Sequence, residues 1–388
     1  MTKASFALTG ATVLPITSEA IENGVVVVQD GKITAVGGAD TAIPSGIETT
    51  DVSGKWVVPG LIDAHAHVGV SEEGMGWAGN DVNELTDPVT SHVRALDAIN
   101  PAERGFRDAI EGGVLTLNIN PGSGNVIGGE TVAIKAHGRT VDEMALRSPS
   151  GVKSALGENP KRVYGDQKKT PSTRLGIAAV LRSAFVDAQN YMAKHAAATP
   201  EKPAERDLKM ESLVKVLKGE IPWRQHCHRA DDIATAMRVA EEFGYTLVLD
   251  HGTEAHLLAD IVAEKNIPVI IGPLVTSRSK VELQNRSIAN PGRLERAGVT
   301  IAITTDSPVV PIGHLITQVV LAVKEGLSRE NALATVTINP ARIMGVDDRV
   351  GSLEVGKDAD LCVWSGDPLD IYSRVETAFI DGNDVTER

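Results

Sequence analysis

Between about residue 61 and residue 345, short apolar runs alternate with segments in which apolar positions recur at helical spacing. Residues 231–243, for example, place Ile233, Met237 and Ala240 on one face of a helix. The strand-like runs include GVLTLNIN, YTLVLDHG, IPVIIGP and VTIAITTDS. Such alternation is typical of repeated βα units. The sequence therefore predicts an α/β fold with a (β/α)8 TIM barrel over residues 58–345, and an open doubly wound sheet is the alternative.

Both ends of the chain show a different pattern, in which short strand-like runs are separated by Gly and Asp turns. Near the beginning, VVVVQDGKITAVGG contains the pair Asp30-Gly31, which is typical of a β-hairpin turn. Near the end, GSLEVGKDADLCVW and TAFIDGNDV are further strand-like runs. We therefore expect residues 1–57 and 346–388 to form one small β-sandwich domain beside the barrel.

One segment departs from the alternation of strands and helices. Residues 171–220 are rich in Ala, Lys and Glu, and Pro200 and Pro203 interrupt their helical pattern. This segment predicts two helices inserted between two strands of the barrel.

Composition supports this architecture and excludes some partners. Only 3% of the residues are aromatic while 42% are hydrophobic, so the core must consist mainly of Val, Ile, Leu and Ala, as in parallel sheets covered by helices. A net charge of −13 without a basic cluster argues against nucleic acid and membrane surfaces as partners. Two widely separated cysteines, with no targeting segment or membrane span, indicate a cytoplasmic protein.

Two histidines end one of the strand-like runs. In PGLIDAHAHVGV, His65 and His67 are separated by one residue, so in a strand both side chains point to the same side. Taken alone, this pair is as consistent with hydrogen-bonded histidines in a barrel wall as with metal ligands.

Other strand-like runs end in residues of similar chemistry. They are His226 and His228 in RQHCHRADD, His251 in LVLDHGT and Asp306 in IAITTDSP. In a (β/α)8 barrel the carboxyl ends of the strands meet at one mouth, where the active sites of such enzymes lie. Several imidazoles and a carboxylate at one mouth match the nitrogen and oxygen ligands of a catalytic zinc site.

The motif GLIDAHAH after a strand-rich leader, followed in order by HCH, DHGT and TTDSP, resembles the amidohydrolase superfamily, especially its imidazolonepropionase-like branch. The closing VGSLEVGKDADLCVW resembles the return of that group's chain to its small β domain. The resemblance implies a metal-dependent hydrolase that holds one or two divalent ions, expected to be Zn²⁺. The implied ligands are His65 and His67 from the first barrel strand, His226 from the fifth, His251 from the sixth and Asp306 from the eighth.

A ligand that bridges two metals has two candidates. Relatives with two metals use a carbamylated lysine on the fourth strand or a glutamate, and SGVKSALGENPKRVYG contains both Lys153 and Glu158. Only a neutral amine takes up CO₂, so carbamylation requires a buried Lys153. We favour Lys153 slightly over Glu158. If neither coordinates, the site holds one metal.

Catalytic and substrate-binding roles follow from this ligand set. Asp306 is expected to carry a proton from the attacking water to the leaving nitrogen. His228 is expected to orient the substrate or to stabilise the oxyanion, with a supporting hydrogen-bonding role as the alternative. We expect substrate contacts from His92, Tyr164 and Arg229.

Some neighbouring residues are given other roles. Strand alternation would turn Asp250 and Cys227 away from the metal-facing side. Arg278 is a weaker candidate for contact with a substrate. The glycine-rich PGSGNVIGG lacks the spacing of a phosphate-binding loop, so we expect it to shape the pocket at the barrel mouth.

The predicted activity is hydrolysis of a carbon–nitrogen bond in an amide or cyclic amide of a small molecule, by a metal-activated water. A deaminase of the same superfamily is the first alternative, although the glutamate usual after the fifth-strand histidine is absent from HCHRADD. A metal-free scaffold descended from such enzymes is the second, and metal analysis would distinguish it. A homo-oligomer is also compatible with the resemblance.

Overall fold

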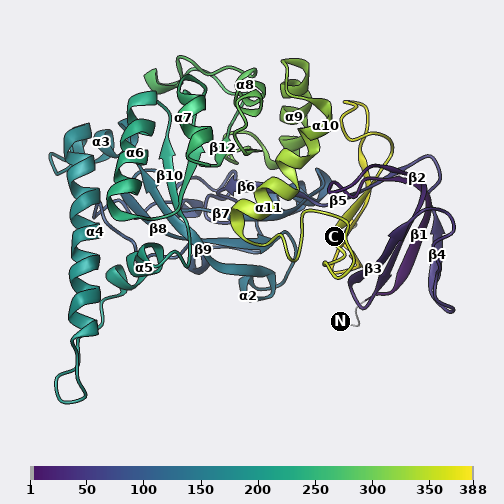
Figure 1. The fold of residues 1–388 in the computed structure, drawn as a ribbon, viewed down its shortest axis with the longest axis horizontal. Coiled ribbons are helices and arrows are strands. Elements are labelled where there is room, and N and C mark those ends of the chain that lie inside the picture. Colours follow the sequence, from purple (N-terminus) through teal and green to yellow (C-terminus); the bar gives the residue numbers. More distant parts are fainter. Residues whose placement is uncertain (1–3, 387–388) are drawn as a thin grey trace.

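The computed structural model describes residues 4–386, which form two sheets of eight strands each (Figure 1). One sheet, called the smaller sheet below, lies at the end of the molecule where both chain termini are found. The other, called the larger sheet, belongs to the main body of the molecule. The strands of the smaller sheet are β1 (Phe6–Val13), β2 (Ile21–Gln29), β3 (Lys32–Gly37), β4 (Glu48–Asp51), β5 (Trp56–Pro59), β14 (Leu361–Trp364), β15 (Val375–Ile380) and β16 (Asn383–Asp384).

The smaller sheet is assembled from both ends of the chain, as predicted. Its strand order is β16-β15-β14-β5-β1-β2-β3, and β4 also pairs with β1. The two chain ends meet where β5 runs antiparallel to β14. Asp30 and Gly31 connect β2 to β3 with φ values of +50° and +75°, the left-handed conformation that a tight hairpin turn requires. The boundaries at residues 57 and 346 stay a prediction, and β5 runs across the first of them.

The larger sheet is the predicted barrel. Its strands follow one another in chain order, from the first to the eighth. They are β6 (Leu61–Ala66), β7 (Val114–Ile119), β8 (Ile127–Lys135), β9 (Ala145–Ala155), β10 (Trp223–Cys227), β11 (Leu247–His251), β12 (Val269–Ile271) and β13 (Ile301–Ile303). Neighbours are parallel except at β8, which runs antiparallel to both β7 and β9. Antiparallel neighbours need no crossover helix, so the short glycine-rich segment joins β7 to β8 directly.

Side chains close the barrel between its first and last strands. The buried carboxylate of Asp63 in β6 accepts hydrogen bonds from the hydroxyls of Thr304 and Thr305, which follow β13. The backbone N–H of His67 donates to the carbonyl of Ser307 at 2.9 Å. These hydrogen bonds between the first and last strands fix the backbone next to His65, His67 and Asp306.

Helices cover the outside of the barrel (Figure 1). They are α1 (Arg104–Glu111), α2 (Val141–Met144), α3 (Glu158–Asp166), α4 (Arg174–Ala196), α5 (Leu208–Leu217), α6 (Ala230–Phe243), α7 (Ala259–Glu264), α8 (Asn290–Arg296), α9 (Leu315–Lys324), α10 (Arg329–Ala332) and α11 (Ile338–Met344). Within residues 4–386, none of these helices combines the length and the apolar character that crossing a bilayer requires.

The predicted pair of helices in residues 171–220 is confirmed as α4 and α5. Helix α4 begins after Thr173, whose side-chain oxygen accepts the N–H of Gly176 as an N-cap. It lies along the edge of the molecule farthest from the smaller sheet (Figure 1). Phe185 attaches it to the barrel, because its ring packs 4.9 Å from that of Trp223 and 4.8 Å from that of Tyr245.

Candidate metal centre

The carboxyl ends of the barrel strands surround a cavity of ≈ 290 Å³. A single wall of this cavity carries the ionisable residues that sequence reasoning expected to converge. They are His65, His67, His226, His228, His251 and Asp306. The structure therefore brings together residues that are separated by up to 241 positions in the chain.

The expected ligands lie within reach of shared ions. The carboxylate oxygen Oδ1 of Asp306 is 3.2 Å from Nε2 of His67 and 3.6 Å from Nε2 of His65. The ring of His251 is centred 4.8 Å from that of His65 and 4.5 Å from that of His226. Ligand atoms of His65, His67 and Asp306 all lie within 4.8 Å of one another, a spacing that a cation could draw together.

Two of these residues hold a backbone conformation that is uncommon outside glycine. His251 has a φ of +73° and Asp306 a φ of +54°, both in the left-handed region. Such backbones cost on the order of 1–3 kcal/mol each and persist where surrounding contacts hold them, often at functional sites. Both residues stand at or just after the end of a barrel strand.

In two imidazoles, a hydrogen bond from one ring nitrogen leaves the other nitrogen available to a metal. Nδ1 of His67 is 2.8 Å from the carbonyl of Asn120, and Nδ1 of His251 is 2.8 Å from the carbonyl of Gly272. A carbonyl can only accept, so each Nδ1 carries the hydrogen and the Nε2 of the neutral ring keeps a free lone pair. Partners of this kind orient metal-binding histidines in other proteins.

His226 in β10 and His228 just after this strand each have a buried ring nitrogen without a partner. Within the described chain, Nδ1 of His226 and Nε2 of His228 have no hydrogen-bond partner. The other ring nitrogens are occupied, since Nε2 of His226 lies 3.5 Å from the amide nitrogen of Asn159 and Nδ1 of His228 lies 2.8 Å from the hydroxyl of Thr253. Buried polar atoms are rarely left unpaired, so these nitrogens fit a bound cation.

Burial keeps the imidazoles in the form that binds metals. It lowers the pKa of His65, His226 and His228 well below the usual range, and it lowers the pKa of His251 as well. Burial alone would raise the pKa of Asp306, but His251, together with His67 and His65, lowers that pKa overall. At neutral pH these four imidazoles are therefore neutral, and the carboxylate of Asp306 is ionised.

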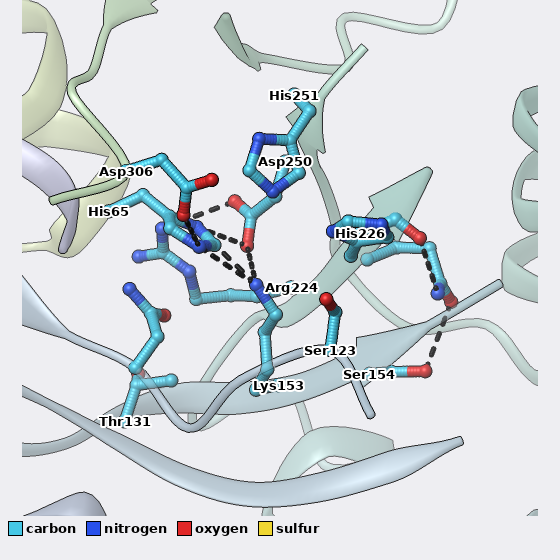
Figure 2. Close-up of polar contacts among 12 residues, drawn as sticks. His65, Ser123, Thr131, Lys153, Ser154, Arg224, His226, Asp250, His251 and Asp306 are labelled. Atoms are coloured by element: carbon cyan, nitrogen blue, oxygen red, sulfur yellow. Dashed lines mark hydrogen bonds and ion pairs between the residues drawn. The ribbon is translucent and has the colours of Figure 1, made fainter. Parts of the chain in front are cut away.

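Lys153 from β9 reaches this wall from inside the barrel (Figure 2). Its buried amine lies 3.0 Å from Nε2 of His65 and 3.4 Å from Oδ2 of Asp250. Burial lowers the pKa of Lys153, and a neutral amine is the form that can be carbamylated. Glu158, the other bridging candidate, begins α3 and does not line the cavity within the described residues.

Asp250 corrects one of the predictions. The expectation that it points away from the mouth is wrong, because its buried carboxylate contacts Nδ1 of His65 at 3.0 Å and Nη2 of Arg224 at 3.2 Å (Figure 2). The alternation rule assumes a regular strand, and the left-handed backbone of His251 departs from strand geometry. Both neighbours can therefore serve the same site.

Comparison with known proteins agrees with this geometry. A model of the amidohydrolase family matches residues 56–385. The chain belongs to the amidohydrolase family. This confirms the resemblance drawn from the ordered histidine motifs, and it makes the protein a hydrolase that acts on carbon–nitrogen bonds.

The relatives of this amidohydrolase differ in how much of their own length the chain matches. The chain is 30% identical to the amidohydrolase tasK of Hapsidospora irregularis over 93% of its own length, but it spans only 39% of that protein. It is 27% identical to an imidazolonepropionase of Mesorhizobium japonicum, over 89% of this chain and 87% of the relative. The crystal structure of an amidohydrolase from Thermotoga maritima has 47% identity and a TM-score of 0.96, and the match covers 99% of this chain and 100% of that one.

The substrate contacts predicted for this amidohydrolase lie elsewhere in the structure. Within the described chain, neither His92, Tyr164, Arg229 nor Arg278 lines the cavity. His92 is exposed, and Arg229 pairs with Asp231 at 2.9 Å at the start of α6. His92 and Arg278 lie on loops, Arg229 precedes α6 and Tyr164 lies in the second half of α3. The direction of side chains on such segments depends on distant contacts.

A Tyr164 variant tests whether this residue contacts the substrate. Its buried hydroxyl donates to the backbone carbonyl of Asp87 at 2.8 Å. The Tyr164→Phe variant of this amidohydrolase is expected to lose about 1 kcal/mol of unfolding free energy, the usual net contribution of one hydrogen bond. Its KM should remain unchanged. A KM increased by tenfold or more would instead return Tyr164 to the substrate-binding residues.

Asn159 and Lys280 are among the cavity-lining residues of this amidohydrolase that sequence reasoning missed. Asn159 is the second residue of α3, shortly after the end of β9, and Lys280 lies between β12 and α8. Neither residue belongs to a histidine motif or ends a strand-like run, so no pattern in the sequence marked them.

Proposed function

We propose that this amidohydrolase cleaves the carbon–nitrogen bond of an amide or cyclic amide in a small molecule, with a divalent metal, expected to be zinc, held at the barrel mouth. The convergence of His67, His251 and Asp306 with the unpartnered ring nitrogens on one cavity carries this proposal. Nitrogen and oxygen ligands with room for water are typical of catalytic zinc sites.

The proposed ligand set follows the distances between the side chains at the barrel mouth. His65, His67 and Asp306 would hold one ion, because their ligand atoms already cluster. His226 and His251 would hold a second ion, and Lys153, if carbamylated, would bridge the two. A further group of ligand atoms within 4.8 Å, from His226, His228 and Glu282, is also available to a cation.

The chemistry divides between the ion and the side chains. When bound, the metal would lower the pKa of water from 15.7 toward about 7 and polarise the carbonyl under attack. Asp306, ionised and facing the cavity, would accept the proton of the attacking water and deliver it to the leaving nitrogen. His228 would contact the carbonyl oxygen through its unpartnered Nε2.

Metal removal tests this function. Metal-loaded protein should hydrolyse members of a panel of N-acyl amino acids, dipeptides, lactams and imidazolones. Chelation should lower that activity by about 100-fold or more, because water and carbonyl lose their activation. Added Zn²⁺ should restore it.

The same experiment separates the alternatives. Metal content is measured by plasma mass spectrometry, and hydrolysis and ammonia release are followed in parallel. A protein that binds no stoichiometric metal would be a scaffold. Ammonia release from exocyclic amino groups without amide hydrolysis would make it a deaminase.

A further inference from the structure

Lys280 brings a positive charge to the cavity of the candidate metal centre. It lies in the loop between β12 and α8 and is one of the residues that line the cavity. Its ammonium donates a hydrogen bond to Oδ1 of Asn159 at 3.2 Å. Within residues 4–386 this is its one hydrogen bond, and no carboxylate forms an ion pair with it.

Three carboxylates act on Lys280 through their charge without forming an ion pair with it, those of Glu282, Glu158 and Asp306. Oε1 of Glu282, two residues along the loop, accepts hydrogen bonds from Nη2 of Arg174 and from the backbone N–H of Glu158, both at 2.7 Å, while its buried Oε2 has no hydrogen-bond partner within the described chain. Asp306 faces His67 and His65. The cavity therefore contains an amine that no carboxylate of the described residues contacts directly, so an anion that enters the cavity can form the direct contact.

Asn159 connects this ammonium to the metal-facing wall. Its amide nitrogen donates to Oγ of Ser123 at 2.7 Å and lies 3.5 Å from Nε2 of His226. The amide oxygen of the same side chain holds Lys280. One amide side chain thus separates the ammonium from an imidazole of the proposed metal site.

The other cavity walls would not compete for an anion. Lys280 is the one Lys or Arg among the cavity-lining residues of the described chain. Much of the remaining lining is apolar or neutral, and it includes Val82, Leu283, Val309, Ser71 and Thr276. A negatively charged group that enters the cavity would find its opposite charge at Lys280.

We propose that Lys280 is the anion-binding residue of this cavity, and that the substrate is a small amide with a carboxylate a few bonds from the carbon–nitrogen bond that is cleaved. This inference rests on the proposed amide hydrolysis. A carboxylate fits the observations better than a phosphate, because a single ammonium faces the cavity and phosphate sites commonly gather several cations or backbone N–H groups. Lys280 would thereby determine specificity, while the reacting bond lies at the metal.

Matched ligands that differ in one charge test the inference. Binding to metal-loaded protein is measured by calorimetry for N-acetylglycine, N-acetylalanine, N-acetylleucine and N-acetylmethionine, each against its neutral carboxamide. Wild-type protein should prefer at least one acid by about tenfold or more, the usual gain from a hydrogen bond between charged groups. Lys280→Met should reduce that preference to about onefold, and Lys280→Arg should retain most of it.

A surface variant controls for net charge. Lys265→Met removes an equal charge from a partly exposed side chain that pairs with Glu241 at the end of α7. It should keep the wild-type preference, and circular dichroism should show that all three variants are folded.

The outcomes also separate the inference from the proposed function. An acid preference that persists in Lys280→Met would place the anion on the metal and overturn the role of Lys280. Wild-type protein without any acid preference, including failure to bind every acid, would overturn it too. Lys280-dependent acid binding in a metal-loaded protein that hydrolyses none of the amide panel would support the subsite and contradict the hydrolase function.

Discussion

Replacing Asp306 with asparagine is expected to lower kcat for amide hydrolysis by about 10²- to 10⁴-fold, the range typical of a lost general acid–base group. Asparagine has nearly the same shape, but its amide cannot accept the water's proton or offer a charged ligand oxygen. In the structure the carboxylate of Asp306 lies 3.2 Å from Nε2 of His67, within the proposed ligand set. The comparison requires kcat, KM and metal content of both proteins.

An exposed aspartate supplies the control for this variant. Asp348 lies on the surface after α11, and Asp348→Asn should leave kcat unchanged. Metal content distinguishes the two roles assigned to Asp306. If Asp306→Asn retains its metal but loses kcat, proton transfer is the dominant role. Wild-type kcat in the variant would remove Asp306 from the mechanism.

Replacing Lys135 with methionine is expected to lower the unfolding free energy by about 3–5 kcal/mol, as when one partner of a buried ion pair is removed. The ammonium of Lys135, in β8, lies 2.8 Å from Asp358, 3.0 Å from Asp360 and 2.8 Å from Asp381. These aspartates belong to the segment that returns to the smaller sheet. The variant would leave buried negative charges without their shared cation. Urea unfolding, followed by circular dichroism, measures the difference.

The size and pH dependence of the effect distinguish this buried cation from a surface one. Lys55 pairs with Glu376 on the exposed smaller sheet at 2.7 Å, so Lys55→Met should cost less than about 1 kcal/mol. Burial raises the pKa of Asp360. Protonation of Asp360 at lower pH removes a charge that Lys135 compensates, so the loss in Lys135→Met should shrink as the pH falls. A loss below about 1 kcal/mol at neutral pH would contradict the buried-pair interpretation.

The chain order of its motifs made much of this site predictable. Strand ends in a barrel meet at one mouth, so the positions of His226, His251 and Asp306 in their runs were sufficient to bring them together. The same rule placed Lys153 on the fourth strand, where its amine lies 3.0 Å from Nε2 of His65. Burial of its amine then depended only on side chains that point into the barrel.

Other parts of the structure depend on geometry that pattern reasoning does not contain. The antiparallel direction of β8 follows from a connection without a helix, and the apolar pattern of a buried strand is the same in either direction. Asp250 and His251 serve the same site because the left-handed backbone of His251 departs from strand alternation. Lys280 and Tyr164 lie on segments outside the barrel strands, and whether such a side chain enters the cavity is decided by partners far along the chain, such as Asp87 for Tyr164.

The smaller sheet has a consequence for how the molecule is made. Strand β5 needs β14 as its neighbour, and the apolar cluster under the sheet combines Leu8 and Val57 with Leu361 and Val363. A ribosome releases the two halves of this cluster some 300 residues apart. The first strands must therefore stay without their final partner until translation is nearly finished. A nascent chain that stops short of Leu361 exposes an unpaired strand edge, which can pair with other chains and which chaperones would bind.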